Sequence, residues 1–289
     1  MKRERVVIAI FAFALILGIV WLDWRFDTHA GSLVVITLVG AFGLAELYGI
    51  LTRIGLAPDG KFGVGAIVLL LGSRGVLPWL EVGPDVSRSI VMGLFSMIIV
   101  APFVSIIFTQ GPKYPKGREE FDRAAATLLG LLYVWVLLSF LLELRLVTTE
   151  AGGTSTIKGL YLVLILVFSV KLGDSFAYLV GRTIGSTPFS WVSPKKTWEG
   201  AAASVLGAAG VAVLLGLLLG FVWWRMLIFG VVTNSAGQLG DLVESLFKRR
   251  SGMKDSGTLL REIGGFLDLL DSLLFAAPVA YLLVLLLGV

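Results

Sequence analysis

The chain carries a group of acidic and polar side chains between positions 234 and 271, in a sequence that is otherwise strongly apolar. The group comprises Asn234, Gln238, Asp241, Glu244, Ser245, Asp255, Asp268 and Asp271. A charged side chain at mid-bilayer depth costs about 3 kcal/mol or more, so acids inside a membrane usually mark a functional site. Neighbouring carboxylates also repel one another, and a divalent cation with oxygen ligands relieves that repulsion. These residue types therefore predict a cation site.

Helical spacing places most of these residues on a shared face. Successive intervals of 4, 3, 4 and 3 residues form one polar stripe, since an α-helix has 3.6 residues per turn. The stripe consists of Asn234, Gln238, Asp241, Ser245 and Lys248, and Glu244 borders it. For Asn234 and Gln238, hydrogen bonding between packed helices is an alternative explanation.

Two further apolar segments carry acids at the same spacing. Asp268 and Asp271 lie one turn apart, and Lys171, Asp174 and Tyr178 share a face. Asp174, Asp241 and Asp271 each lie six or seven residues from the expected end of a helix. At 1.5 Å per residue this is a depth of roughly 10 Å. We therefore expect three helices to present carboxylates at one level.

Two basic loops are expected directly above this level. They are residues 193–200 (SPKKTWEG) and 248–257 (KRRSGMKDSG). Their Ser, Thr and Gly residues are typical of phosphate cradles built from backbone and hydroxyl groups. Together with the acids, the loops predict a site for a metal–triphosphate. Basic loops also serve simply to set membrane topology, and that alternative stays open.

The composition is that of a polytopic membrane protein. Of the 289 residues, 57% are hydrophobic and 15% are charged, and the mean hydropathy is +0.92. Soluble domains have about 45–50% apolar and about 25% charged residues. No shift in composition marks a soluble domain. We expect one continuous membrane domain, with N-terminal helices in residues 1–110 and catalytic helices in residues 111–289.

The residue inventory excludes several kinds of chemistry. The chain has no cysteine and a single histidine, His29, in a loop expected to face away from the charged site. This excludes thiol catalysis, disulfides, iron–sulfur clusters and a Ser-His-Asp triad, and it argues against a zinc site. The formal net charge of +4 reflects membrane topology rather than nucleic-acid binding.

The predicted fold is all-α, a polytopic transmembrane bundle of about nine spans. A span needs roughly 20 apolar residues. The candidates are 6–24, 32–52, 62–81, 89–109, 124–144, 159–181, 200–220, 225–247 and 265–288. The first is expected to be a retained signal anchor. In the third, Gly72, Arg74, Gly75 and Pro78 interrupt the apolar run, and a broken or re-entrant element is the alternative.

The basic residues predict the orientation. With the N-terminus inside, seventeen of the 24 Lys and Arg residues fall in inner segments. Because cytoplasmic loops carry an excess of Lys and Arg, we expect a cytoplasmic N-terminus and a C-terminus outside. The predicted localisation is a prokaryotic-type plasma membrane, with the active site facing the cytoplasm.

Sequence motifs over about residues 170–275 match those of a known family. The C-terminal signature is Ser245, Lys248-Arg249, Lys254-Asp255, Gly264-Gly265, Asp268 and Asp271. The upstream motifs are Asp174-x-x-Ala177-Tyr178-x-x-Gly181-Arg182, Ser193-Pro194-Lys195-Lys196-Thr197-x-Glu199-Gly200 and Gly240-Asp241-Leu242-x-Glu244-Ser245. At these residues the chain resembles CDP-diacylglycerol synthases, also called phosphatidate cytidylyltransferases. It departs from the family pattern at Arg261, Ile263 and Leu269.

The resemblance implies a reaction and a set of residue roles. The family transfers a cytidylyl group from CTP to phosphatidic acid, giving CDP-diacylglycerol and pyrophosphate. The implied metal ligands for Mg²⁺ are Asp241, Asp268 and Asp271, with Asp174 as a candidate for a second cation, Mg²⁺ or K⁺. The implied catalytic residues also include Lys248, Arg249 and Lys254. The implied substrate-binding residues are Ser193, Lys195, Lys196, Thr197, Ser245, Lys248 and Arg249. Expected partners are CTP, phosphatidic acid and membrane lipids, and whether the chain forms a homodimer is open.

Two other functions would use a similar inventory. A CTP-dependent lipid-alcohol kinase would transfer the γ-phosphate instead of the cytidylyl group. The residue 193–200 loop and the Asp268–Asp271 pair favour the synthase over the kinase. A cation-coupled transporter would also bury acids. We find no convincing internal repeat for it, and the polar groups gather toward one face only.

Overall fold

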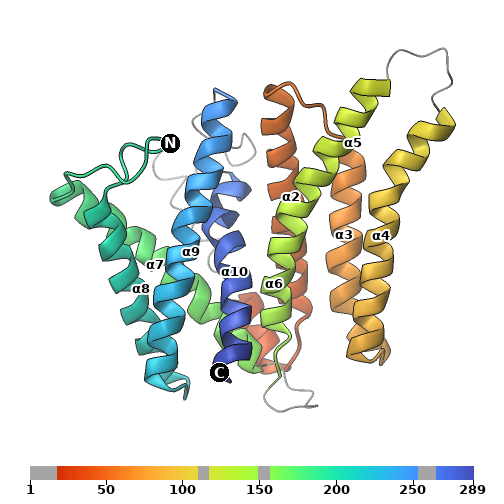
Figure 1. Ribbon diagram of the computed structural model, residues 1–289. Helices are drawn as coiled ribbons and strands as arrows, with labels where there is room; N and C mark the ends of the chain where they lie inside the picture. The colour runs from red at the N-terminus through yellow and green to blue at the C-terminus, as the bar shows by residue number, and fades with distance from the viewer. Residues whose placement is uncertain (1–17, 110–116, 149–156, 253–264) are drawn as a thin grey trace.

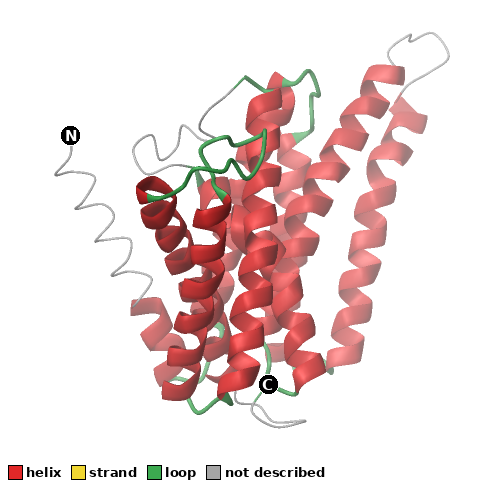
Figure 2. Ribbon diagram, turned by 60° about the vertical axis from the view of Figure 1, so that its left-hand side comes forward, coloured by secondary structure: helices red, strands yellow, loops and turns green. Residues whose placement is uncertain are grey.

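The computed structural model describes residues 18–109, 117–148, 157–252 and 265–289. These residues form a bundle of helices (Figures 1 and 2), and the β-structure among them is one isolated bridge between Pro188 and Thr197. The helices are α2 (Ala30–Arg53), α3 (Gly60–Val76), α4 (Pro84–Thr109), α5 (Gly117–Leu131), α6 (Leu137–Arg145), α7 (Ile157–Thr183), α8 (Trp198–Leu218), α9 (Trp223–Arg250) and α10 (Phe266–Leu287). A 3-10 turn, Leu77–Leu80, follows α3, and a π-helical turn, Leu132–Val136, joins α5 to α6.

Eight helical segments within the described residues are long and apolar enough to cross a membrane. They coincide with the second to the ninth predicted spans, which confirms those eight. Residues 18–25 are helical, but most of the first predicted span, 6–24, lies outside the described residues. The all-α membrane fold follows from a simple constraint: backbone polar groups in lipid must be satisfied within the segment, and a helix achieves this.

The third span is continuous rather than broken. α3 runs without interruption to Val76, and Pro78 lies at the start of the following 3-10 turn, where a missing N–H donor costs little. Arg74 is buried inside the bundle. Its Nε and Nη2 atoms donate to the Glu143 carboxylate at 2.6 and 3.0 Å, and its Nη1 donates to Ser87 at 3.3 Å. Arg74, one of the residues that interrupt the apolar run, is thus paired with Glu143 of α6.

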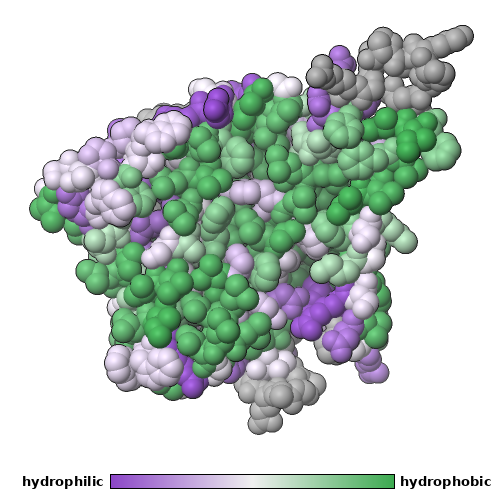
Figure 3. Space-filling model, in the orientation of Figure 1, coloured by the Kyte–Doolittle hydropathy of each residue, from purple (hydrophilic) through white to green (hydrophobic). Residues whose placement is uncertain are grey.

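The helices form two groups joined by α10. α10 packs against α9 and α7 on one side and against α6 and α2 on the other. α7, α8 and α9 form the left part of Figure 1, while α3, α4 and α5 form the right part. The face in Figure 3 is largely apolar, with polar residues gathered toward its edges. Exposed apolar side chains such as Met97 and Leu206 suit contact with lipid.

The two ends of the bundle differ in character. At the upper end in Figure 1, α7 and α9 finish and α8 and α10 begin. His29 directly precedes α2 at the opposite end, away from the acidic cluster as predicted, and its Nε2 lies 2.9 Å from the Gly75 carbonyl oxygen. Burial lowers the pKa of His29 below its usual value. Arg145 and Asp23 form a buried ion pair at that same end, at 3.5 Å.

Candidate active site between α7, α9 and α10

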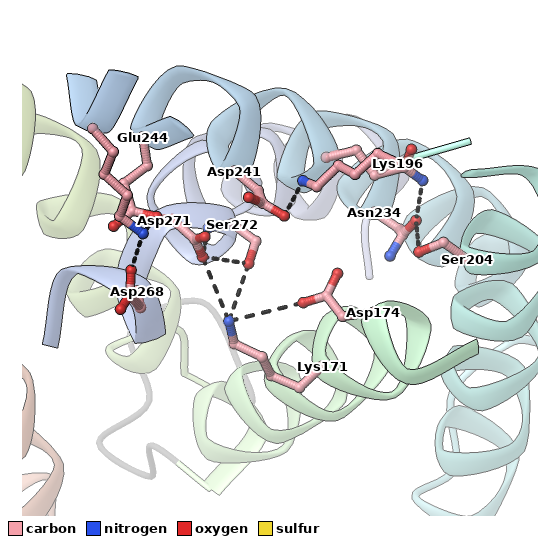
Figure 4. A network of polar contacts seen from close by, with 12 residues as sticks. Lys171, Asp174, Lys196, Ser204, Asn234, Asp241, Glu244, Asp268, Asp271 and Ser272 are labelled. Carbon is pink, nitrogen blue, oxygen red and sulfur yellow. Dashed lines mark hydrogen bonds and ion pairs between the residues drawn. The ribbon is translucent and has the colours of Figure 1, made fainter. Parts of the chain in front are cut away.

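Three carboxylates from two helices meet inside the bundle. Ligand oxygens of Asp241 and Glu244 of α9 and Asp271 of α10 all lie within 4.8 Å of one another. Glu244 is 1% exposed and Asp271 is 7% exposed. Figure 4 shows these side chains beside Asp174 of α7 and Asp268 of α10. The structure thus brings together two of the three acids that were predicted to meet, Asp241 and Asp271, while Asp174 of α7 is linked to them through Lys171.

A glycine allows α9 and α10 to approach closely at this point. A Cβ atom on Gly240 would lie 3.1 Å from the carbonyl carbon of Asp271 and 3.0 Å from Cδ2 of Phe275. Small residues at helix contacts let the backbones approach in this way. Because Gly240 precedes Asp241, the close approach brings the Asp241 carboxylate beside Asp271.

Three lysines contribute ammonium groups to the cluster. Lys171 of α7 donates to Ser272 Oγ at 3.0 Å and lies 3.6 Å from Asp271 and 3.9 Å from Asp174. Lys248 lies 2.9 Å from Glu244 Oε2 and also pairs with Asp268. Lys196, from the loop before α8, pairs with Asp241 (Figure 4).

The charges of this cluster fit one divalent cation. In the ion-pair network that the described residues form here, five carboxylates face three ammonium groups, so two negative charges are in excess when all five carboxylates are ionised. In addition, Glu244 Oε1 is buried and has no hydrogen-bond partner among the described residues. Buried polar atoms are normally satisfied, so an orphan carboxylate oxygen points to a missing ligand. Oxygen donors are the ligands that Mg²⁺ prefers.

Asp268 has a different environment from the other predicted metal ligands. It pairs with Lys248, and its Oδ2 accepts a hydrogen bond from the Gly265 N–H at 2.8 Å, which caps the start of α10. The third carboxylate beside Asp241 and Asp271 is Glu244, which borders the polar stripe and was not among the predicted ligands. Its spacing of three residues from Asp241 was the available signal.

The basic loop before α8 is held in a defined conformation. The Phe189 N–H donates to the Lys196 carbonyl at 2.7 Å, and the Trp198 N–H donates to the Thr187 carbonyl at 3.0 Å. Thr197 caps α8, since its Oγ1 accepts from the Gly200 N–H at 3.2 Å. These bonds place Lys196 at the N-terminus of α8, facing Asp241.

A cavity of about 570 Å³ lies between this loop and helices α7, α8 and α9. Its polar lining includes Asp174, Arg182, Lys195, Lys196, Thr197 and Asp241. Tyr178 and Phe189 add aromatic surface. The cavity thus has cationic groups at its upper end and a carboxylate of the cluster in its wall. Such a space suits a polyanion that is held together with a metal ion.

Other residues predicted for the site have different positions. Arg249 donates through Nε to the Val192 carbonyl at 3.2 Å and so ties the end of α9 to the basic loop. Ser193 lies in that loop, and Ser245 lies on α9 one residue beyond Glu244. Lys254 and Asp255, together with the departures Arg261 and Ile263, lie outside the described residues.

Asn234 and Gln238 link helices, which is the alternative that their spacing had left open. Asn234 Oδ1 accepts from Ser204 Oγ of α8 at 3.1 Å and from Gln238 Nε2 at 3.0 Å. Gln238 also donates to the Ala201 carbonyl at 3.1 Å and reaches the cavity wall. Ser204, which the sequence reasoning missed, gives no spacing signal because it lies on an apolar helix.

The fold and the site together define a polytopic helical membrane protein with a buried cluster of acids and lysines beside a basic cavity. The chain matches the cytidylyltransferase family over residues 3–287. It therefore belongs to that family, which confirms the resemblance seen in its motifs.

Individual relatives agree with this assignment. The chain is 31% identical to a phosphatidate cytidylyltransferase of Synechocystis, over 99% of this chain and 98% of that protein. It is 34% identical to one of Staphylococcus saprophyticus, over 64% of this chain and 67% of the relative. It is 36% identical to phosphatidate cytidylyltransferase 5, chloroplastic, of Arabidopsis thaliana, over 60% of this chain. The match spans 48% of that plant protein, or about half its length.

Proposed function

We propose that this chain transfers the cytidylyl group of CTP to phosphatidate, giving CDP-diacylglycerol and pyrophosphate. The proposal rests on one observation: the cavity with its basic residues lies next to the carboxylate cluster. Lys196 and Asp241, which both line the cavity, form an ion pair, and Asp241 also belongs to the cluster. A nucleotide triphosphate and a phosphate monoester both need such cationic groups. The names of the relatives from Synechocystis and Staphylococcus saprophyticus support the same reaction.

The proposed reaction needs no nucleophile from the protein. An oxygen of the phosphatidate phosphate bonds to the α-phosphorus of CTP, and the bond from that phosphorus to the bridging oxygen of the β-phosphate breaks. The pyrophosphate keeps the electron pair and leaves. Because the attacking phosphate is already anionic, the chain's residues must align the groups and neutralise their charge. The chain has no cysteine, and its one histidine, His29, lies far from the cluster, which agrees with a reaction that uses no nucleophile or histidine base from the protein.

The residues around the cavity have distinct proposed roles. Lys195, Lys196 and Arg182 would bind the triphosphate oxygens from the loop side of the cavity. Lys248, held by Glu244 and Asp268, would face the phosphate that is transferred or displaced. Lys171 would hold the carboxylates of Asp271 and Asp174 in place.

The carboxylates fit a Mg²⁺ ion, on the grounds of charge excess and the unpaired Glu244 oxygen given above. Asp241, Glu244 and Asp271 would hold it. Bound there, Mg²⁺ would supply charge neutralisation for the phosphates. Asp268 as a direct ligand, and a second cation at Asp174, stay predictions.

We further propose that the upper end of the bundle, which contains the site, faces the cytoplasm. Several basic residues of the described segments lie at that end, and cytoplasmic ends are enriched in such residues. They are Arg53, Lys61, Arg123, Arg182, Lys195, Lys196, Lys248, Arg249 and Arg250. CTP would reach the cavity from that side, and the lipid substrate would enter from the adjacent leaflet.

Labelled CTP tests the proposal directly. Purified protein with phosphatidate and Mg²⁺ should move label from [α-³²P]CTP into lipid and release pyrophosphate, while label from [γ-³²P]CTP should stay in the aqueous phase. Transfer of the γ label to a lipid alcohol would establish the kinase instead. Protein without phosphatidate is the control.

A further inference from the structure

The long helix from α5 to α6 contains an irregular turn beside the acidic cluster. Residues Leu132–Val136 form a π-helical turn, flanked by α5 and α6. Such turns are rare, insert one extra residue into the helix, and occur frequently at functional sites. The turn contains Tyr133, which faces the packed α9 and α10.

The Tyr133 ring packs against both helices that carry the carboxylates, α9 and α10. Its ring lies 5.6 Å from the ring of Phe247 in an edge-on arrangement and 6.3 Å from the ring of Phe275. Phe247 follows Glu244 by three residues, and Phe275 follows Asp271 by four. Each phenylalanine therefore lies one turn from a carboxylate on the same helix face. Glu244 and Asp271 are the acids whose charges act on the Tyr133 hydroxyl.

Two polar atoms at this contact have no partner among the described residues. One is the buried hydroxyl of Tyr133, and the other is Oε1 of Glu244. The second carboxylate oxygen of Glu244 is occupied by Lys248, at 2.9 Å. Buried polar atoms are normally hydrogen-bonded, so both orphan atoms call for a partner, and a donor and an acceptor can satisfy each other.

We propose that Tyr133 is a positioning residue for Glu244. Its hydroxyl donates a hydrogen bond to one lone pair of Glu244 Oε1 when the other lone pair faces a bound divalent cation, and this bond orients the carboxylate within the cluster. The inference deepens the proposed function, because it rests on the cation site described above. Groups that orient metal ligands typically change metal affinity 10–100-fold when they are removed.

The test is the affinity of the purified protein for Mn²⁺, measured by electron paramagnetic resonance of the free ion, with Mg²⁺ as competitor. Tyr133→Phe removes the hydroxyl and keeps the ring between Phe247 and Phe275. We expect it to weaken Mn²⁺ binding about 10-fold. Tyr281→Phe is the matched control, since Tyr281 also packs on a phenylalanine, Phe140, at 5.9 Å. It should leave the affinity unchanged.

A double-mutant cycle shows whether the effect passes through Glu244. In a Glu244→Gln background, Tyr133→Phe should cause little additional loss of Mn²⁺ affinity. Equal losses in both backgrounds would overturn the inference, and so would an unchanged affinity in the single variant or no Mn²⁺ binding by the parent protein. CDP-diacylglycerol formation by the parent protein is assayed in parallel. If the parent protein synthesises CDP-diacylglycerol but Tyr133→Phe leaves its Mn²⁺ affinity unchanged, only the role of Tyr133 is refuted. If the Tyr133 and Glu244 substitutions have coupled effects on Mn²⁺ affinity but the parent protein makes no CDP-diacylglycerol, only the proposed reaction is refuted.

Discussion

At the scale of single residues, every acid of the cluster pairs with a lysine, but the acids differ in whether their oxygens also meet at one centre. Asp241, Glu244 and Asp271 present oxygens to a common centre, while Asp268 pairs with Lys248 and caps α10. The proposed roles are distinguishable, because loss of a metal ligand would change metal affinity, whereas loss of the Asp268 carboxylate would change the position of the Lys248 ammonium group.

Substitution of the carboxylates tests this separation. Asp241→Asn and Asp271→Asn should each reduce CDP-diacylglycerol formation about 100-fold and raise the Mg²⁺ concentration needed for half-maximal rate, because each removes a charged ligand. Asp268→Asn should lower the maximal rate with little change in that Mg²⁺ concentration, because it releases Lys248. Initial rates over a Mg²⁺ titration measure both quantities. A large shift in the Mg²⁺ requirement for Asp268→Asn would make Asp268 a ligand after all.

Removal of the metal should also change the thermal stability of the protein, which can be measured without an activity assay. With EDTA the excess negative charge of the cluster is no longer neutralised, and a ligand that binds the folded state stabilises it. We expect the melting temperature of the purified protein to fall on chelation and to recover with Mg²⁺. In Asp271→Asn the same titration should give a smaller recovery. An identical response of the variant would place the stabilising ion elsewhere.

At the scale of elements, the site depends on how closely α9 approaches α10. Gly240 makes that approach, and a side chain there has no room. Lys171 of α7 and the capped loop before α8 then close the cluster from the other side. Among the motif residues of α9, Gly240 thus contributes to helix packing rather than to the chemistry of the site.

Gly240→Ala should therefore damage both stability and activity. The added methyl group would press on the Asp271 backbone and Phe275, and overpacking of this kind typically costs about 1–3 kcal/mol. We expect a lower melting temperature together with a reduced rate of CDP-diacylglycerol formation. Gly210→Ala on α8 is the control, because a Cβ there meets no atom within 4 Å. Equal behaviour of the two variants would show that the helix contact is not tight.

At the scale of the whole molecule, the bundle has a basic end that contains the site and an opposite end with buried ion pairs. The cysteine-free sequence makes its orientation measurable, since any single cysteine is a unique label. Arg250 lies at the basic end, and Asp85 is exposed at the other. In intact cells an impermeant maleimide should label Asp85→Cys, and it should label Arg250→Cys only after permeabilisation. The reverse pattern would invert the proposed topology.

Much of this architecture was predictable from the sequence for a local reason. A run of about 20 apolar residues is a helix in lipid because no other conformation satisfies its backbone. Eight predicted spans accordingly match helices of the structure. Acids at turn spacing, such as Asp268 and Asp271, could likewise be assigned to one face, and Asp241 and Asp271 to one depth, since both depend only on position along a helix.

The tertiary structure decided which of these groups meet. Contact between side chains of different helices depends on how each helix is rotated and how closely it packs, and spacing along the chain does not contain that information. In the packed structure, Glu244 rather than Asp268 is the third carboxylate of the group. The π-helical turn that brings Tyr133 to the same interface had no counterpart in the apolar pattern, because one added residue in a turn leaves hydropathy unchanged.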